Sequence, residues 1–253
     1  NWLKELSGTK KSPKQLAELL MMRAFEVESA ERYPHHLENV ADHNGILVLP
    51  EDAPFGETFA KYIGLEDNVL EIKILPDRAD ALAYRGMARE IAALGGHRSR
   101  LHAKGRQVRE KYKPLKILRN NRAPKIVISD KQGCRRYVGI SFENVKVEES
   151  PLWLRTKLIL SGLRPVNNIF DITNYLMLLS GQPIHSFDAD KITVTITVRR
   201  AEKNEKLILL TGETKTLSSE DLVIADDKQV LALAGVMGGE YAAVTKKTKN
   251  IFL

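Results

Sequence analysis

Hydrophobic and polar residues recur with a helical period near the start of the chain. The segment 12–25 opens with Ser12, Pro13 and Gln15; the serine and glutamine have the spacing of a capping box, and the proline suits a first helical turn. The leucines that follow fall on one side of this predicted helix and indicate a buried stripe: Leu16, Leu19 and Leu20.

A second helix is predicted after Asp80, and Gly95 ends it. Its apolar positions lie on one face: Tyr84, Met87, Ile91 and Leu94. Between the two helices, residues 45–50 and 68–76 are short apolar runs that read as strands. These elements predict a small helix and strand domain over residues 1–97.

Two further helices are predicted in the second half of the chain. The first has Ser150 as its cap and ends at Gly162. The second is capped by Asp171 and ends at Gly181, where a rigid Gly-Gln-Pro-Ile-His corner follows.

Strand patterns dominate the remainder of this half. Residues 206–217 predict a hairpin with its turn at Thr211 and Gly212. The other predicted strands are 126–129, 136–141, 145–147, 192–199, 222–225 and 230–237. The chain is therefore expected to belong to the α+β class, with a mixed α+β domain over residues 126–253 after the smaller first domain.

Charge is concentrated between these two predicted domains. The chain has a formal net charge of +7, and residues 98–125 contain 11 Lys and Arg but one acid. This basic segment is either a solvated linker or a stripe that contacts phosphates, because clustered cations release counterions from nucleic acid. The candidate RNA-binding residues are Arg98, Arg100, Lys104, Arg106 and Arg109.

The composition excludes several other classes of protein. Hydrophobic residues make up 43% of the chain and charged residues 28%, which is typical of a globular protein. The single cysteine, Cys134, excludes a disulfide framework and a cysteine zinc site, and it favours a cytoplasmic location. No apolar run has the length of a membrane span, and the histidines lack the spacing of metal ligands.

Two stretches could carry chemistry. His185 closes the Gly-Gln-Pro-Ile-His corner, and Glu240 follows a glycine-rich run that contains Gly235 and Gly239. Glycines weaken a strand and permit close approach of a ligand or of another backbone. Taken alone, the histidine is better explained as a satisfied surface or core side chain, and the glutamate as a solvated residue of a tight turn.

Longer blocks around these residues resemble a known family. Residues 161–191, "SGLRPVNNIFDITNYLMLLSGQPIHSFDADK", and residues 199–240, ending in "LALAGVMGGE", are similar to the editing domain of bacterial phenylalanine–tRNA ligase beta subunits. Residues 1–29 and 44–96 resemble the first domain of the same subunit. Together these blocks cover nearly the whole chain in collinear order, apart from the basic segment.

The resemblance implies roles for individual residues. Glu240 would recognise the hydroxyl group of a misattached tyrosine, and His185 would position water or substrate, with Pro183 holding the corner. Arg164 and Asn174 would orient the tRNA 3′ end and the ester. Small residues would leave room for the aminoacyl group: Ala234, Gly235 and Gly239.

The implied reaction is hydrolysis of tyrosyl-tRNA(Phe) by water, and no covalent nucleophile or metal is assigned. A site built for phenylalanine rejects tyrosine poorly, so a second site that requires the hydroxyl can correct the error. The resemblance further implies an alpha subunit as partner in a heterotetramer of two alpha and two beta chains, with tRNA(Phe) as substrate. ATP and magnesium belong to the complete synthetase, and no cofactor is expected in this chain.

Departures from the family leave alternatives open. The usual tRNA-binding insertion is missing near residues 34–43, and family members continue beyond Leu253. The editing pocket would then be incomplete, and the chain would be a non-catalytic scaffold or tRNA-docking part of the subunit. An unrelated metabolite-binding α+β protein is a third, weaker alternative.

Overall fold

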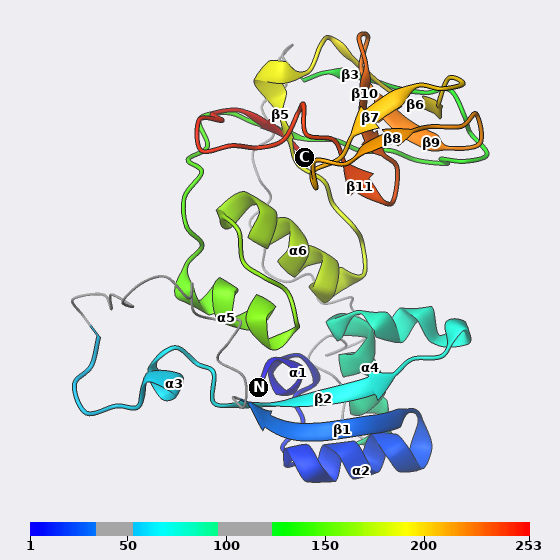
Figure 1. Cartoon of the computed structure of the whole chain (residues 1–253). Helices are drawn as coiled ribbons and strands as arrows, with labels where there is room; N and C mark the ends of the chain where they lie inside the picture. The colour runs from blue at the N-terminus through cyan, green and yellow to red at the C-terminus, as the bar shows by residue number, and fades with distance from the viewer. Residues whose placement is uncertain (34–52, 96–122) are drawn as a thin grey trace. The chain divides into compact units, whose positions relative to one another are not determined.

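The computed structural model describes residues 1–33, 53–95 and 123–253, and it divides the chain into two compact units. The first unit comprises Asn1–Leu115, Ser150–Val166 and Phe170–Gln182. The second comprises Lys116–Glu149, Asn167–Ile169 and Pro183–Leu253. The α-helices lie almost entirely in the first unit and most strands in the second (Figure 1), so the predicted α+β class is confirmed.

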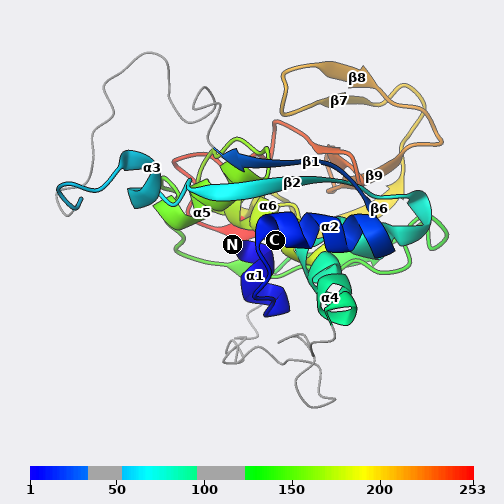
Figure 2. The same cartoon turned by 90° about the horizontal axis from the view of Figure 1, so that it is seen from below.

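The first unit is built around a two-stranded antiparallel ribbon. Strands β1 (Glu26–Tyr33) and β2 (Asp67–Lys73) pair along their length, with an irregularity between Val27 and Ser29. Figure 2 shows the two strands side by side, with α2 running beneath them. The helical elements of this unit are α1 (Trp2–Ser7), α2 (Pro13–Arg23), α3 (Phe59–Tyr62), the 3-10 helix η2 (Pro76–Leu82), α4 (Tyr84–Leu94), α5 (Leu152–Leu160) and most of α6 (Asn168–Ser180).

The predicted capping box at the start of α2 is confirmed. The Gln15 N–H donates to Ser12 Oγ (N···O 3.2 Å), and the Ser12 N–H donates to Gln15 Oε1 (2.9 Å). Two orphan N–H groups of the first turn are thereby satisfied. The predicted stripe of α2 is buried at Leu16 and Leu20, whereas Leu19 is half-buried.

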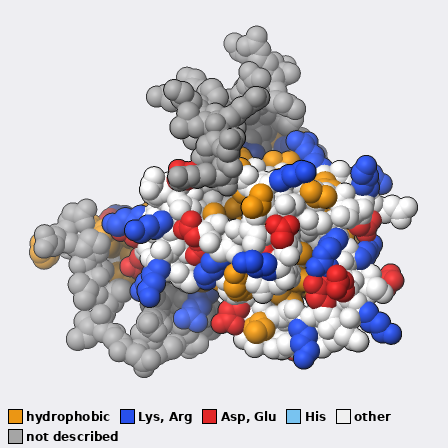
Figure 3. All heavy atoms as spheres, turned by 90° about the horizontal axis from the view of Figure 1, so that it is seen from above, with side chains coloured by type: hydrophobic (Ala, Val, Ile, Leu, Met, Phe, Trp, Pro, Cys, Tyr) orange, Lys and Arg blue, Asp and Glu red, His pale blue; other side chains and the backbone are white. Residues whose placement is uncertain are grey.

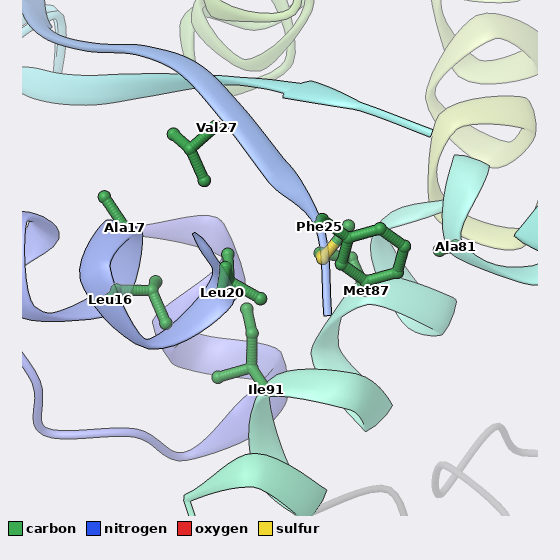
Figure 4. Packing of buried hydrophobic residues seen from close by; sticks show 8 residues of the cluster. All are labelled: Leu16, Ala17, Leu20, Phe25, Val27, Ala81, Met87 and Ile91. Atoms are coloured by element: carbon green, nitrogen blue, oxygen red, sulfur yellow. The ribbon is translucent and has the colours of Figure 1, made fainter. Parts of the chain in front are cut away.

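One hydrophobic cluster joins α2, β1 and α4. Figure 4 shows its side chains converging between the helices and the strand. The cluster contains Leu16, Ala17, Leu20, Phe25, Val27, Ala81, Met87 and Ile91. Burial of these apolar surfaces, contributed by two sequence-distant segments (16–27 and 81–91), holds the first unit together.

A stack of aromatic rings attaches α5 and α6 to this unit. Trp2 stacks on Tyr84 (centroids 3.9 Å apart) and on Tyr175 (5.1 Å), and Trp153 meets Tyr175 edge-on. The ammonium group of Lys157 lies 4.9 Å from the centre of the Trp2 ring. Ring stacking and a cation over an aromatic face both stabilise the fold beyond the contribution of the buried surface area.

The second unit consists mainly of strands. A five-stranded sheet has the order β11-β10-β9-β6-β3, in which β3 pairs with β6 in parallel and the other neighbours are antiparallel. A three-stranded sheet has the order β4-β12-β5, and β7 pairs with β8 as a hairpin that Figure 2 shows as a separate ribbon. The bounds are β3 (Lys125–Ile128), β4 (Ser141–Phe142), β5 (Phe187–Asp188), β6 (Thr195–Arg200), β7 (Lys206–Ile208), β8 (Thr214–Thr216), β9 (Leu222–Ala225), β10 (Val230–Leu233), β11 (Met237–Gly238) and β12 (Ile251–Phe252), with a 3-10 turn η4 (Ala189–Lys191).

Several predicted strands of this unit are confirmed. The apolar run 222–225 is β9, and the alternating segment 192–199 contains β6, in which Ile196 and Val198 are buried. The hairpin 206–217 turns at Gly212, which has φ 82°. The predicted strand 45–50 lies outside the described residues.

Two predicted strands are wrong for the most part. Of residues 136–141 only Ser141 is in a strand, and residues 145–147 form none. This part of the chain pairs with the last residues only over a short length. Ile140 and Leu253 exchange both backbone hydrogen bonds (2.8 Å each) beside the β4–β12 pair, and the Val145 N–H donates to the Lys249 carbonyl (2.8 Å). The paired stretch is too short to make strands of residues 136–140 and 145–147, although the apolar residues there resemble a strand.

Two predicted helix caps are also wrong. Pro151, not Ser150, is the cap of α5, and α6 begins at Asn168, three residues before Asp171. Ser150 and Asp171 bond to each other instead, as described below. The end of α6 is as predicted, because Gly181 adopts φ 80° directly after Ser180.

The compact units do not follow the predicted division at residues 98–125. Residues 150–166 and 170–182, which contain α5 and most of α6, group with the first unit. The sequence placed them in the domain 126–253 because they follow its first strands. Tyr175 of α6 stacks on Trp2 of α1 instead, and Trp153 of α5 contacts Tyr175.

Candidate functional site

The ring of His185 packs directly against the glycine-rich strand β11. A Cβ atom built on Gly238 would lie 2.2 Å from His185 Cε1 and 2.4 Å from Nε2, so only a glycine leaves room for the imidazole. On its other side the imidazole meets Phe187 edge-on, with centroids 4.5 Å apart. The two sequence stretches that could carry chemistry therefore meet at one point in the second unit.

Backbone pairing places more side chains on the same face. Leu209 and Gly239 form an antiparallel bridge, the Leu210 N–H donates to the Gly238 carbonyl (3.1 Å), and the Glu240 N–H donates to the Ile208 carbonyl (2.9 Å). Opposite residues of an antiparallel pair share a face, and residues two apart in an extended segment do as well. Leu210, Ile208 and Glu240 consequently belong to the face that His185 covers at Gly238.

Burial supports this assignment of faces. Leu207 and Leu209 are buried, whereas Ile208 is 49% and Leu210 39% exposed. A Cβ on Gly239 would point the opposite way, 2.7 Å from Leu207 Cδ1 and 2.8 Å from the Leu231 carbonyl oxygen. The exposed face thus combines an imidazole, a carboxylate and two apolar side chains. We call Ile208, Leu210, Gly238, Glu240 and the overlying His185 the histidine face.

Burial favours the uncharged form of the His185 imidazole near neutral pH. Burial lowers the pKa of His185 below its usual value of 6.5. A neutral imidazole has one nitrogen that can accept a hydrogen bond from water. In the described ranges, no three His, Cys, Asp or Glu side chains gather in a way that could hold a metal ion.

Comparisons with known proteins agree on one family. The family described as the B3/4 domain matches residues 133–253. The phenylalanine–tRNA ligase beta subunit of Fusobacterium nucleatum is 43% identical over 216 residues, covering 84% of this chain and 26% of that protein. The corresponding subunit of Carboxydothermus hydrogenoformans is 43% identical over 219 residues, covering 86% and 26%.

The chain is a homologue of phenylalanine–tRNA ligase beta subunits. It spans about a quarter of the length of these curated relatives. A solved N-terminal fragment of the phenylalanyl-tRNA synthetase beta subunit from Pyrococcus horikoshii is also similar, with a TM-score of 0.42 and 18% identity over 99% of this chain and 64% of that one. None of the helices in the described part of this beta-subunit homologue has the length and apolarity for a bilayer crossing.

The three small residues predicted near the ligand differ in their backbone conformation, hydrogen bonding and burial in this homologue. Gly235 adopts φ 73° in the turn between β10 and β11, and a Cβ there would meet open space. Ala234 donates its N–H to the Leu222 carbonyl (2.9 Å) and packs on the core of the second unit. Gly239 is buried and points away from the histidine face. Of the three, only Gly235 faces free space.

The remaining predicted residues are distributed over both units. Pro183 is exposed two residues before His185. Arg164 is exposed and Asn174 half-buried, and both belong to the first unit, whereas the histidine face belongs to the second. The candidate RNA-binding residues lie outside the described residues: Arg98, Arg100, Lys104, Arg106 and Arg109.

Sequence reasoning missed Ile208 and Leu210. The run Leu-Ile-Leu-Leu at 207–210 is continuously apolar, so alternation between its two faces is not visible in it. The glycine-rich run did indicate a close approach, and its Gly238 is the residue that the imidazole contacts.

Proposed function

We propose that this chain is an editing module of a phenylalanine–tRNA ligase beta subunit that hydrolyses tyrosyl-tRNA(Phe). The observation that carries the proposal is the packing of His185 on Gly238. This contact joins the two stretches of family resemblance on one exposed face. Membership in the beta-subunit family supplies the substrate class.

The proposed reaction is attack of water on the ester that links the amino acid to the terminal ribose. The water oxygen bonds to the carbonyl carbon and loses a proton, the bond from that carbon to the ribose oxygen breaks, and the ribose oxygen takes up a proton to become a hydroxyl as tyrosine is released. Positioning of the water and stabilisation of the developing oxyanion are sufficient for an activated ester.

His185 is the proposed positioning group for this water. Its lowered pKa keeps the imidazole neutral, so a ring nitrogen accepts a hydrogen bond from the attacking water. Ile208 and Leu210 offer apolar surface beside it for the aromatic part of the substrate. Arg164 and Asn174 remain proposed contacts to the tRNA 3′ end and the ester.

Glu240 is proposed as the group that reads the tyrosine hydroxyl, but its setting limits the selectivity that it provides. Discrimination by a hydrogen bond is strong when the acceptor is buried, because a substrate that lacks the donor then leaves it unpaired. The Glu240 side chain is exposed, and water satisfies it when phenylalanine is bound. We therefore expect a modest preference for tyrosine from this residue alone.

A second candidate function is tRNA docking without hydrolysis. The exposure of Glu240 and the concentration of cations in residues 98–125 favour it. In either case we propose that the chain has an alpha subunit as its partner and functions in the cytoplasm. ATP and magnesium are the proposed cofactors of the complete synthetase.

The test is a deacylation assay on tyrosyl-tRNA(Phe) and phenylalanyl-tRNA(Phe). The wild-type chain should hydrolyse the tyrosyl ester faster than buffer does, and His185→Ala should lower the rate by about a hundredfold. Glu240→Ala should reduce the ratio of the tyrosyl rate to the phenylalanyl rate. Lys228→Ala, a change at an exposed lysine of the same unit, is the matched control.

Wild-type rates at the level of buffer, with tRNA still bound, would favour the docking function. A rate that His185→Ala leaves unchanged would remove the imidazole from the mechanism. An unchanged tyrosyl-to-phenylalanyl ratio in Glu240→Ala would remove the carboxylate from substrate selection.

A further inference from the structure

Asp171 is a fully buried acid, with 0% of its surface exposed, in the first turn of α6. Burial of a carboxyl group is costly unless each oxygen has a hydrogen-bond partner. Both oxygens are satisfied here: Oδ1 accepts from the Val166 N–H (2.9 Å), and Oδ2 accepts from Ser150 Oγ (2.5 Å). The three residues belong to the first unit.

These bonds restrain the connector between α5 and α6. The Leu163 N–H donates to the Leu158 carbonyl (2.9 Å), which ties the start of the connector to the last turn of α5. The Val166 N–H is tied to Asp171. Only Arg164 and Pro165 lie between the two tied residues, and the proline ring fixes its own φ.

Asp171 also lies on the same helix as Asn174, three residues earlier. Residues three apart are neighbours on a helix surface. The carboxyl group is thus the point at which the segment that bears Arg164 and the turn that bears Asn174 are joined.

We propose that Asp171 is a positioning residue that holds the backbone of Arg164 at a fixed place beside Asn174, so that the guanidinium meets a tRNA phosphate or the terminal ribose. The inference rests on the proposed function, because it takes Arg164 and Asn174 as substrate contacts. Asp171 itself touches no substrate, since it is fully buried.

A merely structural acid would behave differently from a positioning one. Loss of a structural group weakens every contact of the unit, so its effect multiplies with that of any other substitution. Loss of a group that acts through Arg164 has no further effect once the guanidinium is gone. The relation between the two residues is therefore measurable as coupling.

The experiment compares Asp171→Ala, Arg164→Ala and the double variant of this chain, with tRNA(Phe) and tyrosyl-tRNA(Phe) as probes. Asp171→Ala removes the acceptor of the Val166 N–H and should accelerate hydrogen exchange of that amide about tenfold or more. It should raise KM for tyrosyl-tRNA(Phe) by a factor close to that of Arg164→Ala, and the double variant should be no worse than Arg164→Ala.

Ser150→Ala is the matched control, because it removes the other hydrogen bond of the same carboxyl group and leaves the Val166 bond. It should lower stability and leave the KM that depends on Arg164 unchanged. If Asp171→Ala does not fold, Val166→Pro removes the N–H donor of the same hydrogen bond and takes its place in the coupling test.

Two results would overturn the inference: losses that multiply in the double variant, or a KM in Ser150→Ala equal to that in Asp171→Ala. A wild-type chain that does not hydrolyse the ester contradicts the proposed function separately. In that case the coupling between the Asp171 and Arg164 substitutions is measured from the Kd for tRNA(Phe). An Arg164→Ala variant that binds tRNA(Phe) with wild-type affinity would overturn the positioning role of Asp171.

Discussion

At the scale of single residues, the contact between His185 and Gly238 makes a direct prediction about stability. Gly238→Ala should destabilise the second unit by about 1–3 kcal/mol, because its methyl group would occupy the space of the imidazole. His185→Ala should relieve most of this cost, since it removes the ring. The measurement is urea unfolding of both single variants and the double variant.

Gly139→Ala is the control for this prediction. Its Cβ would lie 1.9 Å from Phe252 Cζ, away from the imidazole, so it should destabilise the chain equally with His185 present or absent. A Gly238→Ala cost that persists in full after His185→Ala would contradict the packing described for the histidine face.

The buried imidazole also predicts a dependence of stability on pH. The pKa of His185 is lower in the folded chain than its usual value of 6.5, so the unfolded chain binds more protons just below that pH. The free energy of unfolding should therefore decrease as the pH falls from about 6.5 towards the folded pKa. His185→Gln should lose this part of the decrease, which urea titrations at several pH values would reveal; identical pH profiles would contradict the burial of the ring.

At the scale of elements, local signals predicted two helix ends and the hairpin 206–217 well, but the hairpin of β10 and β11 was predicted as the single strand 230–237. Ser12 and Gln15 cap α2 as expected, and Gly181 ends α6, because both signals act within one turn of backbone. The same reasoning failed at Ser150 and Asp171. These residues have the chemistry of caps, but their polar groups satisfy each other across two elements.

The candidate site was predictable only in part for a related reason. The sequence indicated His185 and Glu240 as single candidate residues, one at the end of the Gly-Gln-Pro-Ile-His corner and one after the glycine-rich run. Their common face depends on the pairing of Leu209 with Gly239, which joins segments 30 residues apart in the sequence. Register of that kind is decided by which hydrophobic face is buried.

At the scale of the whole molecule, charge is distributed unevenly between the described surface and the rest of the chain. Figure 3 shows Lys and Arg interspersed with Asp and Glu on the face that it presents. The concentrated positive charge of the sequence is in residues 98–125. We expect this segment to dominate any electrostatic attraction to tRNA.

Neutralising the candidate RNA-binding residues should therefore weaken tRNA binding and flatten its salt dependence. Each lost phosphate contact lowers the slope of log K against log salt by about 0.7–0.9. The measurement is tRNA(Phe) affinity at several salt concentrations, with five Lys or Arg changed to Gln: Arg98, Arg100, Lys104, Arg106 and Arg109.

The control for this prediction neutralises the same number of exposed lysines in the second unit. The control residues are Lys131, Lys203, Lys206, Lys228 and Lys246. A slope that falls equally in both sets would mean that total charge, and not the basic segment, governs the attraction.

The amino-acid sequence by itself determined the class of fold, the ends of its best-capped helices, the family and the presence of a histidine and a glutamate in unusual surroundings. These follow from interactions within a few residues or from long blocks of similarity. Tertiary structure alone decided that α5 and α6 pack on the first unit, that Ser150 and Asp171 bond to each other, and that the His185 imidazole lies on Gly238. Each of these depends on which distant surfaces exclude water together, and no local pattern encodes that choice.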